Sequence, residues 1–190
     1  YDMSGGSLVI ANGGPNRAAF DLLAEEGQAD ILLDAVTVTA ENATGILAVA
    51  AGDSDVRMSV VSSPVTLTSL TASFVGIEVA TSTGSTATMS AALDGNTVTG
   101  GGADVGIRAR ALAAGSTTCV NAEDNASAGV TSSYTMGQTA GTFQFTGWNG
   151  AFTLLANLMV RGNTATGAAP VAVGTIAAGV CTAPTAVTPL

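Results

Sequence analysis

The sequence contains neither lysine nor histidine among its 190 residues. Without histidine the chain cannot form a Ser-His-Asp triad or a histidine metal site, and without lysine it cannot form a Schiff base. Its only cationic side chains are five arginines, which face 14 Asp and Glu, so the net charge is −9. Nucleic-acid binding needs a cationic surface that displaces counterions, so the composition argues against a nucleic-acid partner.

Long apolar runs are also lacking, although 47% of the residues are hydrophobic. The six apolar residues 46–51 are typical, and they end at Gly-Asp-Ser-Asp. A helix needs about 20 consecutive apolar residues to span a bilayer, so we expect no membrane span. Charged residues make up only 10% of the chain, and Thr, Ser, Asn and 24 Gly supply most of the polarity. These residues favour strands and tight turns, and the acidic surface is typical of a soluble extracellular protein.

Two cysteines are present, Cys119 and Cys181. If they pair, they close a loop of about 60 residues, which the chain-entropy model values at about 4 kcal/mol. The alternative is two free, buried thiols that act as small hydrophobic side chains. Because the rest of the composition is typical of secretion, we expect the disulfide.

A short strand start recurs three times, at Gly45-Ile46, Gly76-Ile77 and Gly106-Ile107, with spacings of 31 and 30 residues. A period near 30 with three strand-like segments predicts a coil of β-strands. Like residues then stack in columns, the first of which contains Ile46, Ile77 and Ile107. The residue 13 positions after each glycine is predicted to be a small or sulfur-bearing core residue, and these residues are Met58, Met89 and Cys119.

The pattern predicts one domain, 1–190, that folds as an all-β, right-handed parallel β-helix with three strands per turn. Residues 1–30 contain a strand and then a predicted helix, opened by Gly14-Pro15 and ended by Gly27. That helix could cover the end of the coil or pack on its side. Regular turns follow over 31–130. Over 131–190 bulky aromatic residues replace the small core residues, so we expect a C-terminal cap tied by the disulfide.

Outward positions of the coil carry three candidate sites. Leu47 and Val49 are apolar at outward positions and form a candidate assembly surface, covered by the helix or by a partner chain. Glu78 and Arg108 should be exposed neighbours on adjacent turns, worth at most about 1 kcal/mol. The Thr-x-Thr pairs predict a ladder of threonines on one outer face. This ladder could be an ice- or glycan-binding face, or a structural column in which branched side chains pack on one another. The ladder comprises Thr37, Thr39, Thr66, Thr68, Thr97 and Thr99, and continues with Asn125 and Ser127.

Acidic side chains in the predicted turns offer little chemistry. Asp94 and Asp124 share the same offset from their glycines and are a weak candidate calcium site, but two carboxylates supply too few of the oxygens that calcium needs. Solvated turn carboxylates are the simpler interpretation. The same pair is not visibly arranged to split its pKa values for glycoside hydrolysis, so we expect no enzyme and no cofactor.

The Gly-Ile starts, the Gly-Asn-Thr-x-Thr-Gly segments at 95–100 and 162–167, and residues 116–121 resemble the C-terminal turns of large right-handed parallel β-helix proteins of bacterial cell surfaces. That scaffold is shared by pectin-lyase-like enzymes and autotransporter passengers. The resemblance covers residues 31–181 and implies secretion, without transferring a catalytic residue. We therefore expect a structural extracellular protein, a subunit or processed fragment of a surface fibre, matrix or adhesin, whose partners are copies of itself, glycans or the cell surface.

Overall fold

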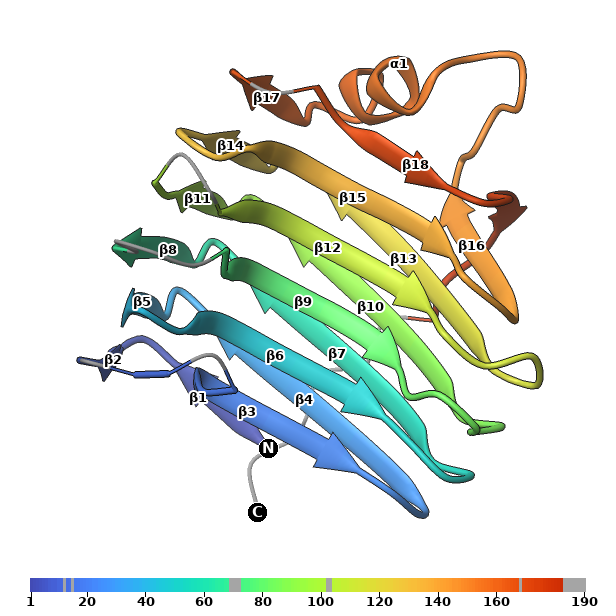
Figure 1. The fold of residues 1–190 in the computed structure, drawn as a ribbon, viewed down its shortest axis with the longest axis horizontal. Coiled ribbons are helices and arrows are strands. Elements are labelled where there is room, and N and C mark those ends of the chain that lie inside the picture. Colours follow the sequence, from blue (N-terminus) through green and yellow to red (C-terminus); the bar gives the residue numbers. More distant parts are fainter. Residues whose placement is uncertain (12, 15, 69–72, 102–103, 168, 183–190) are drawn as a thin grey trace.

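The chain winds into a parallel β-solenoid of three sheets, as the computed structural model shows (Figure 1). The structure describes residues 1–11, 13–14, 16–68, 73–101, 104–167 and 169–182. In Figure 1 the strands of the front sheet run to the right and those of the sheet behind run to the left while the chain climbs, so the coil is right-handed. Each turn of the coil contributes one strand to each sheet.

All strand pairs are parallel, and strand n of the chain pairs with strand n+3, so each turn of the coil repeats the one before it. We call the three sheets A, B and C. Sheet A contains β1 (Asp2–Ser4), β4 (Gln28–Asp34), β7 (Asp55–Val61), β10 (Thr88–Asp94), β13 (Thr117–Glu123), β16 (Thr142–Thr146) and β19 (Ala177–Gly179). Sheet B contains β2 (Ser7–Ile10), β5 (Thr37–Glu41), β8 (Pro64–Thr68), β11 (Thr97–Thr99), β14 (Ala126–Ala128) and β17 (Thr164–Thr166). Sheet C contains β3 (Ala18–Ala24), β6 (Thr44–Ala50), β9 (Val75–Thr81), β12 (Val105–Ala111), β15 (Ser132–Gln138) and β18 (Val171–Val173).

The predicted isoleucine column lies at the centre of the core. Ile46 pairs with Ile77, which pairs with Ile107, and all three side chains are fully buried. Phe20 extends the column in the first turn and Tyr134 in the fifth. Successive side chains of a strand face opposite sides of the sheet, so alternate residues point into the core. The three parallel sheets and this stacked column confirm the predicted fold class.

The repeated glycines mark the corner between sheets B and C, where the backbone of one turn approaches the next. A Cβ atom on Gly45 would lie 2.5 Å from the carbonyl oxygen of Gly76. A Cβ atom on Gly76 would lie 2.7 Å from the carbonyl oxygen of Gly106. Real Cβ atoms do not approach other atoms so closely, so the glycine before each isoleucine is a steric requirement of the corner.

The corner between sheets A and B has its own repeat of two residues. The first residue adopts a positive φ in six consecutive turns, and from the second turn onward the second residue is buried. The positive-φ residues are Gly5 (68°), Ala35 (52°), Ser62 (49°), Gly95 (64°), Asp124 (52°) and Gly162 (75°). The Gly-Asn-Thr segments of the sequence are two copies of this corner. The left-handed residue turns the chain from sheet A into sheet B within two positions.

The predicted N-terminal helix is wrong, because residues 18–24 form strand β3. Phe20, Leu22 and Leu23 could form the apolar side of a helix, but Phe20 and Leu22 also fit an alternating strand, and β6 offers the segment backbone partners along its length. Leu23 instead points outward and is 58% exposed. Residues 1–30 therefore contain a complete first turn, β1 to β3, and not a cap. Pro15, part of the predicted helix start, lies outside the described residues.

The cap lies at the opposite end of the coil. After β16 the chain forms the helix α1 (Leu154–Met159), which begins at the N-cap Thr153. Leu154 and Leu158 of α1 join the core, and Phe143 and Phe145 of β16 fill the space beneath them. Trp148 packs edge-on against Phe145, with the ring centroids 6.5 Å apart. The predicted aromatic, disulfide-tied C-terminal cap is thus confirmed, with a helix added.

Candidate assembly surfaces

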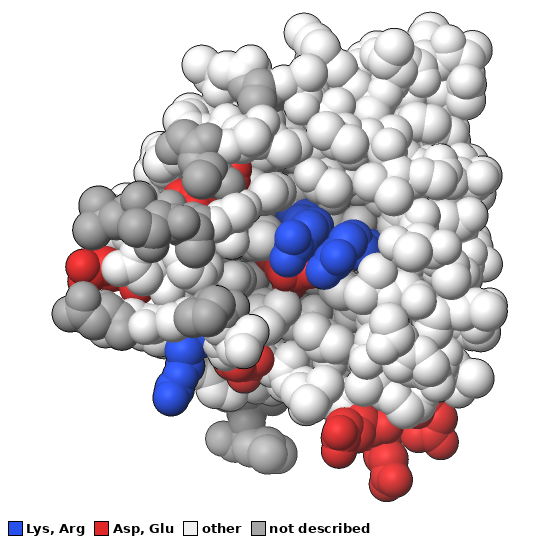
Figure 2. Space-filling view, viewed as in Figure 1, with Lys and Arg blue, Asp and Glu red and all other residues white. Residues whose placement is uncertain are grey.

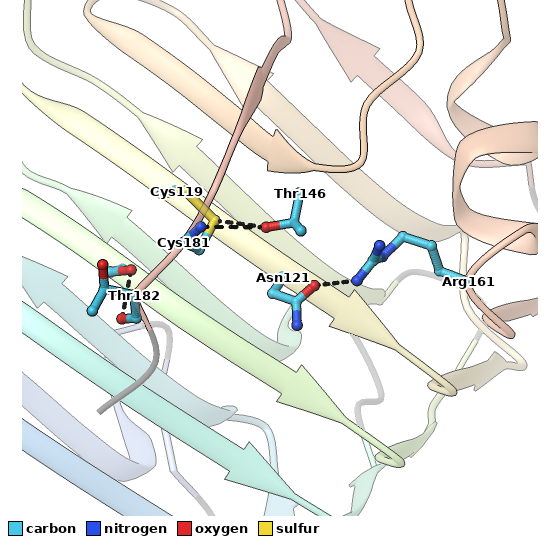
Figure 3. The surroundings of a disulfide bond; sticks show 7 residues. Cys119, Asn121, Thr146, Arg161, Cys181 and Thr182 are labelled. Atoms are coloured by element: carbon cyan, nitrogen blue, oxygen red, sulfur yellow. Dashed lines mark hydrogen bonds between the residues drawn. A yellow bond between two sulfur atoms is a disulfide. The ribbon is translucent and has the colours of Figure 1, made fainter. Parts of the chain in front are cut away.

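The disulfide joins the C-terminal segment to the outer face of sheet A (Figure 3). Cys119 lies on β13 and Cys181 follows β19, 62 residues later. One residue further on, the Thr182 carbonyl accepts a hydrogen bond from Ser90 of β10 at 2.9 Å. Residues 180–182 therefore run across the outer face of sheet A, over β13 and β10, and we call this segment the C-terminal strap.

Met58 and Met89 are core residues as predicted, but Cys119 is not. The three do not share a register, because Met58 pairs with Ala91 and Cys119 pairs with Ser90. Cys119 points outward, toward the strap, rather than into the core. The corner between sheets C and A contains four residues in one turn (51–54), six in the next (82–87) and five in the next (112–116), so residues at equal distance from the glycine fall on different registers.

A groove of about 290 Å³ lies beside the strap on the outer face of sheet A. Polar side chains dominate its walls, and the strap itself contributes Val180 and Thr182. Thr88 donates a hydrogen bond of 2.6 Å to Asp55 across it. The other polar lining residues are Arg57, Ser90, Thr117 and Gln144. The volume is close to the lower limit for small-molecule sites, about 300 Å³.

The threonine ladder exists, but in a different register from the predicted one. Thr39 pairs with Thr66, and Thr66 pairs with Thr99, whereas Thr68 pairs with Glu41 and Thr97 pairs with Pro64. The Thr66 and Thr99 hydroxyls lie 3.4 Å apart and are exposed. Thr37 pairs with Ser7. The aligned face is therefore a single column of three threonines, flanked by Val9 on one side and Ala128 on the other.

Asn125 and Ser127 do not continue that ladder, because both side chains point inward and are buried. Asn125 belongs instead to a buried column at the corner between sheets A and B, which continues through Asn96 and Asn163. The backbone N–H of Asn96 donates to the Asn125 Oδ1 at 3.0 Å, and the backbone N–H of Asn125 donates to the Asn163 Oδ1 at 3.1 Å. The Asn125 amide also donates to the Leu93 carbonyl at 2.8 Å. This asparagine column satisfies backbone groups of three consecutive corners that would otherwise be buried without partners.

The sequence contained a signal for this column. Asn96, Asn125 and Asn163 each stand directly before a sheet B strand, and Gly-Asn-Thr occurs at both 95–97 and 162–164. Ser63 takes the equivalent position one turn earlier, where its backbone N–H donates to the Asn96 Oδ1 at 3.0 Å. The column is structural and offers no exposed chemistry.

Sheet C presents the face that carries Leu47 and Val49, both half-buried. Arg108 and Arg110 lie on the same face, and both bind the carboxylate of Glu78. Figure 2 shows this pair of cations at the centre of a face that is otherwise mostly uncharged. Glu78 pairs in register with Leu47 and with Arg108, as predicted.

The expectation of an exposed pair is wrong in one respect, because Glu78 is only 5% exposed. Arg108 donates to it through Nε at 2.9 Å and through Nη2 at 2.5 Å, and Arg110 adds a third hydrogen bond at 2.6 Å. The two guanidinium groups cover the carboxylate and compensate its desolvation.

Asp94 and Asp124 do not face each other. Asp94 pairs with Glu123, and Asp124 follows in the corner with a positive φ. Within the described residues, no three Asp, Glu, Cys or His side chains gather closely enough to hold a metal ion. The geometry gives no support to the candidate calcium site.

The exposed large hydrophobic side chains of the described residues all lie in the first turn or in the last forty described residues. In the first turn they are Tyr1, Val9 and Leu23. Near the other end they are Phe152, Leu155, Met159, Val160, Val171 and Val180. Isolated apolar side chains are common on any surface, but their concentration at the two ends of a coil marks the ends as candidate contact surfaces.

Comparisons with protein-family models, with curated proteins and with solved structures found no significant match. None of the helical segments in the described part of the chain is long and apolar enough to cross a membrane.

Proposed function

We propose that this chain is a structural β-solenoid of the extracellular environment, a unit of a surface fibre, matrix or adhesin that associates with copies of itself. The observation that carries the proposal is the concentration of exposed large hydrophobic side chains in the first turn and at the end of the coil that carries α1; of the exposed large hydrophobic residues in the described part of the chain, Val180 is the exception, since it lies in the strap on the outer face of sheet A. The apolar surface of these side chains is removed from water only when another surface covers it, and this removal is favourable. The proposal assigns the chain no catalytic activity.

Two further features support this role. The Cys119–Cys181 bridge is a long-range disulfide, which persists in oxidising compartments outside the cytosol. The three sheets and the asparagine column repeat along one axis, which gives a stiff unit whose stability comes from contacts between neighbouring turns.

Sedimentation velocity over a range of protein concentrations tests the proposal. We expect the average sedimentation coefficient to rise with concentration, and to rise further in ammonium sulfate, which strengthens the burial of apolar surface. A single monomeric species at all concentrations and in sulfate would refute self-association.

A monomeric binding module is the second candidate, because the polar groove beside the C-terminal strap has hydroxyl and amide groups suited to a sugar. The column of Thr39, Thr66 and Thr99, of which Thr39 is half-buried and the other two are exposed, is the corresponding candidate for ice. A glycan array and an ice-recrystallisation assay on the monomeric fraction test these roles. Activity that is lost in Thr88→Val or in Thr66→Val, respectively, would favour this candidate over assembly.

A further inference from the structure

The N-terminal end of the coil is open. Within the described residues, β1, β2 and β3 each have a strand partner on one side only. The inward side chains of this turn, including Leu8, Phe20 and Leu22, are only partly buried, although their counterparts in the middle turns are fully buried. A hollow of about 240 Å³ lies on this turn, next to Ile10. Unpaired strand edges over a half-covered apolar core are a surface that favours pairing.

The C-terminal end carries a projecting apolar helix. Figure 1 shows α1 extending beyond β18 at the end of the coil. While Leu154 and Leu158 face the core, Leu155 and Met159 are 39% and 61% exposed. Phe152 and Val160 flank them and are also exposed. The helix is therefore apolar on both sides, and one of these sides is left without cover by the described residues.

Charge distinguishes the possible pairings of these ends. The first 27 residues contain four acidic residues and one arginine, whereas the only charged residue after position 124 is Arg161. Figure 2 shows acidic side chains gathered at the lower end of the molecule, where the first turn lies. Two N-terminal ends in contact would bring like charges together, but an N-terminal end against the nearly uncharged α1 end would not.

Coverage of the open first turn favours the same pairing. Because α1 extends beyond β18, copies that stack with the same orientation bring the exposed apolar side of α1 against the first turn of the next copy (Figure 1). A contact between two α1 ends would instead leave both open first turns uncovered.

We propose that copies of this chain stack head to tail, with the α1 surface of one copy (Phe152, Leu155, Met159 and Val160) against the first turn of the next. This inference rests on the self-association proposed above and specifies its polarity. Because the two contacting surfaces differ, the contact is heterologous. A stack formed in this way leaves one unused surface at each end, so it extends into a filament unless its rotation closes a ring.

Variants that block one end each can test the polarity. Leu155→Glu with Met159→Glu blocks the α1 end, and Val9→Glu with Leu23→Glu blocks the first turn. All four side chains are exposed, so each double variant should fold like the wild type, which circular dichroism checks. Leu47→Glu with Val49→Glu lies one turn further along the same outer face of sheet C as Leu23, so it is the matched control that separates a contact at the end of the coil from a lateral contact along this face.

We expect each end-blocked variant alone to remain monomeric at concentrations at least about tenfold above those at which the wild type associates, because burying a carboxylate against apolar surface is costly. An equimolar mixture of the two should form a species of two copies and nothing larger, because one intact surface of each kind is present. The Leu47/Val49 variant should associate like the wild type.

Three results would overturn the inference: dimers of either end-blocked variant alone, a mixture that stays monomeric, or loss of association in the Leu47/Val49 variant. In each of these the wild type still associates, so the proposed function would stand and only the polarity would fall. A wild type that never associates would overturn both.

Discussion

The middle turns of the coil and its two ends are built from the same repeat but differ in how they cover it. Between β4 and β15 each strand has a neighbour on both sides, and inward residues such as Ile77 are completely buried. In the first turn the same positions are partly exposed, whereas at the other end α1 supplies the cover and the C-terminal strap ties the chain to the outer face of sheet A. In the middle of the coil, neighbouring turns bury the core of each turn. At the ends one neighbour is lacking, so a cap or a partner is needed to cover the core.

The largest expected effect concerns the C-terminal end. The double variant Cys119→Ser with Cys181→Ser should lower the free energy of unfolding by about 4 kcal/mol, because the disulfide closes a loop with a sequence separation of 62 residues. Hydrogen exchange should show most of the new opening in β19 and the strap. Urea denaturation with and without reductant provides the measurement.

Ser90→Ala is the control, since it removes only the hydrogen bond to the Thr182 carbonyl. If the disulfide variant and this control lose the same small amount of stability, the strap does not hold the end of the coil.

In the middle of the coil we expect the next largest effect from Asn125→Ala. The change removes acceptors from the Asn96 backbone and amide groups and a donor from the Leu93 carbonyl, all of them buried. The loss of stability should be about 3 kcal/mol, because each unsatisfied buried group costs about 1–3 kcal/mol. Asn16→Ala, at an exposed turn position of the first turn, should change stability by less than about 0.5 kcal/mol. Thermal unfolding of both variants checks the difference, and equal losses would show that the asparagine column is not special.

The smallest expected loss of stability comes from changing Tyr134. This residue pairs with Ile107 and so continues the isoleucine column into the C-terminal turns. Its hydroxyl lies 2.9 Å from the Asn125 carbonyl and 3.1 Å from the Thr164 carbonyl, and burial raises its pKa. The folded state therefore favours the neutral phenol, so stability should fall as pH rises above about 10, the unfolded pKa. Tyr134→Phe should cost about 1 kcal/mol at neutral pH and should flatten this alkaline decline. An unchanged slope in urea denaturation between pH 9 and 11 would show that another group causes the decline.

Much of the middle of the coil could be predicted from the sequence, because the glycine at the corner between sheets B and C is a steric requirement and therefore visible as a repeat. The register of sheets A and B could not be predicted in the same way. Counting residues from the glycine fails where corners differ in length, as for Met58 and Met89. Counting also fails in β8, which begins at Pro64, a residue more typical of turns but tolerated at the first position of a strand.

The ends were harder to predict because their structure depends on what covers them. Residues 18–24 carry both a helix-like and a strand-like pattern, and the neighbouring strand β6 decides between them. The burial of Glu78 was missed because it needs two arginines from the next turn, of which pairing alone indicated one. The candidate assembly pair Leu47 and Val49 lies where predicted, on an outward face, but the strongly exposed side chains lie elsewhere, at the ends.

Negative-stain electron microscopy of the wild-type protein at high concentration tests the central claim most directly. The account predicts unbranched rods whose lengths are multiples of a single coil, joined end to end. Fields that contain only single short particles, or sheets of particles joined along their sides, would contradict it.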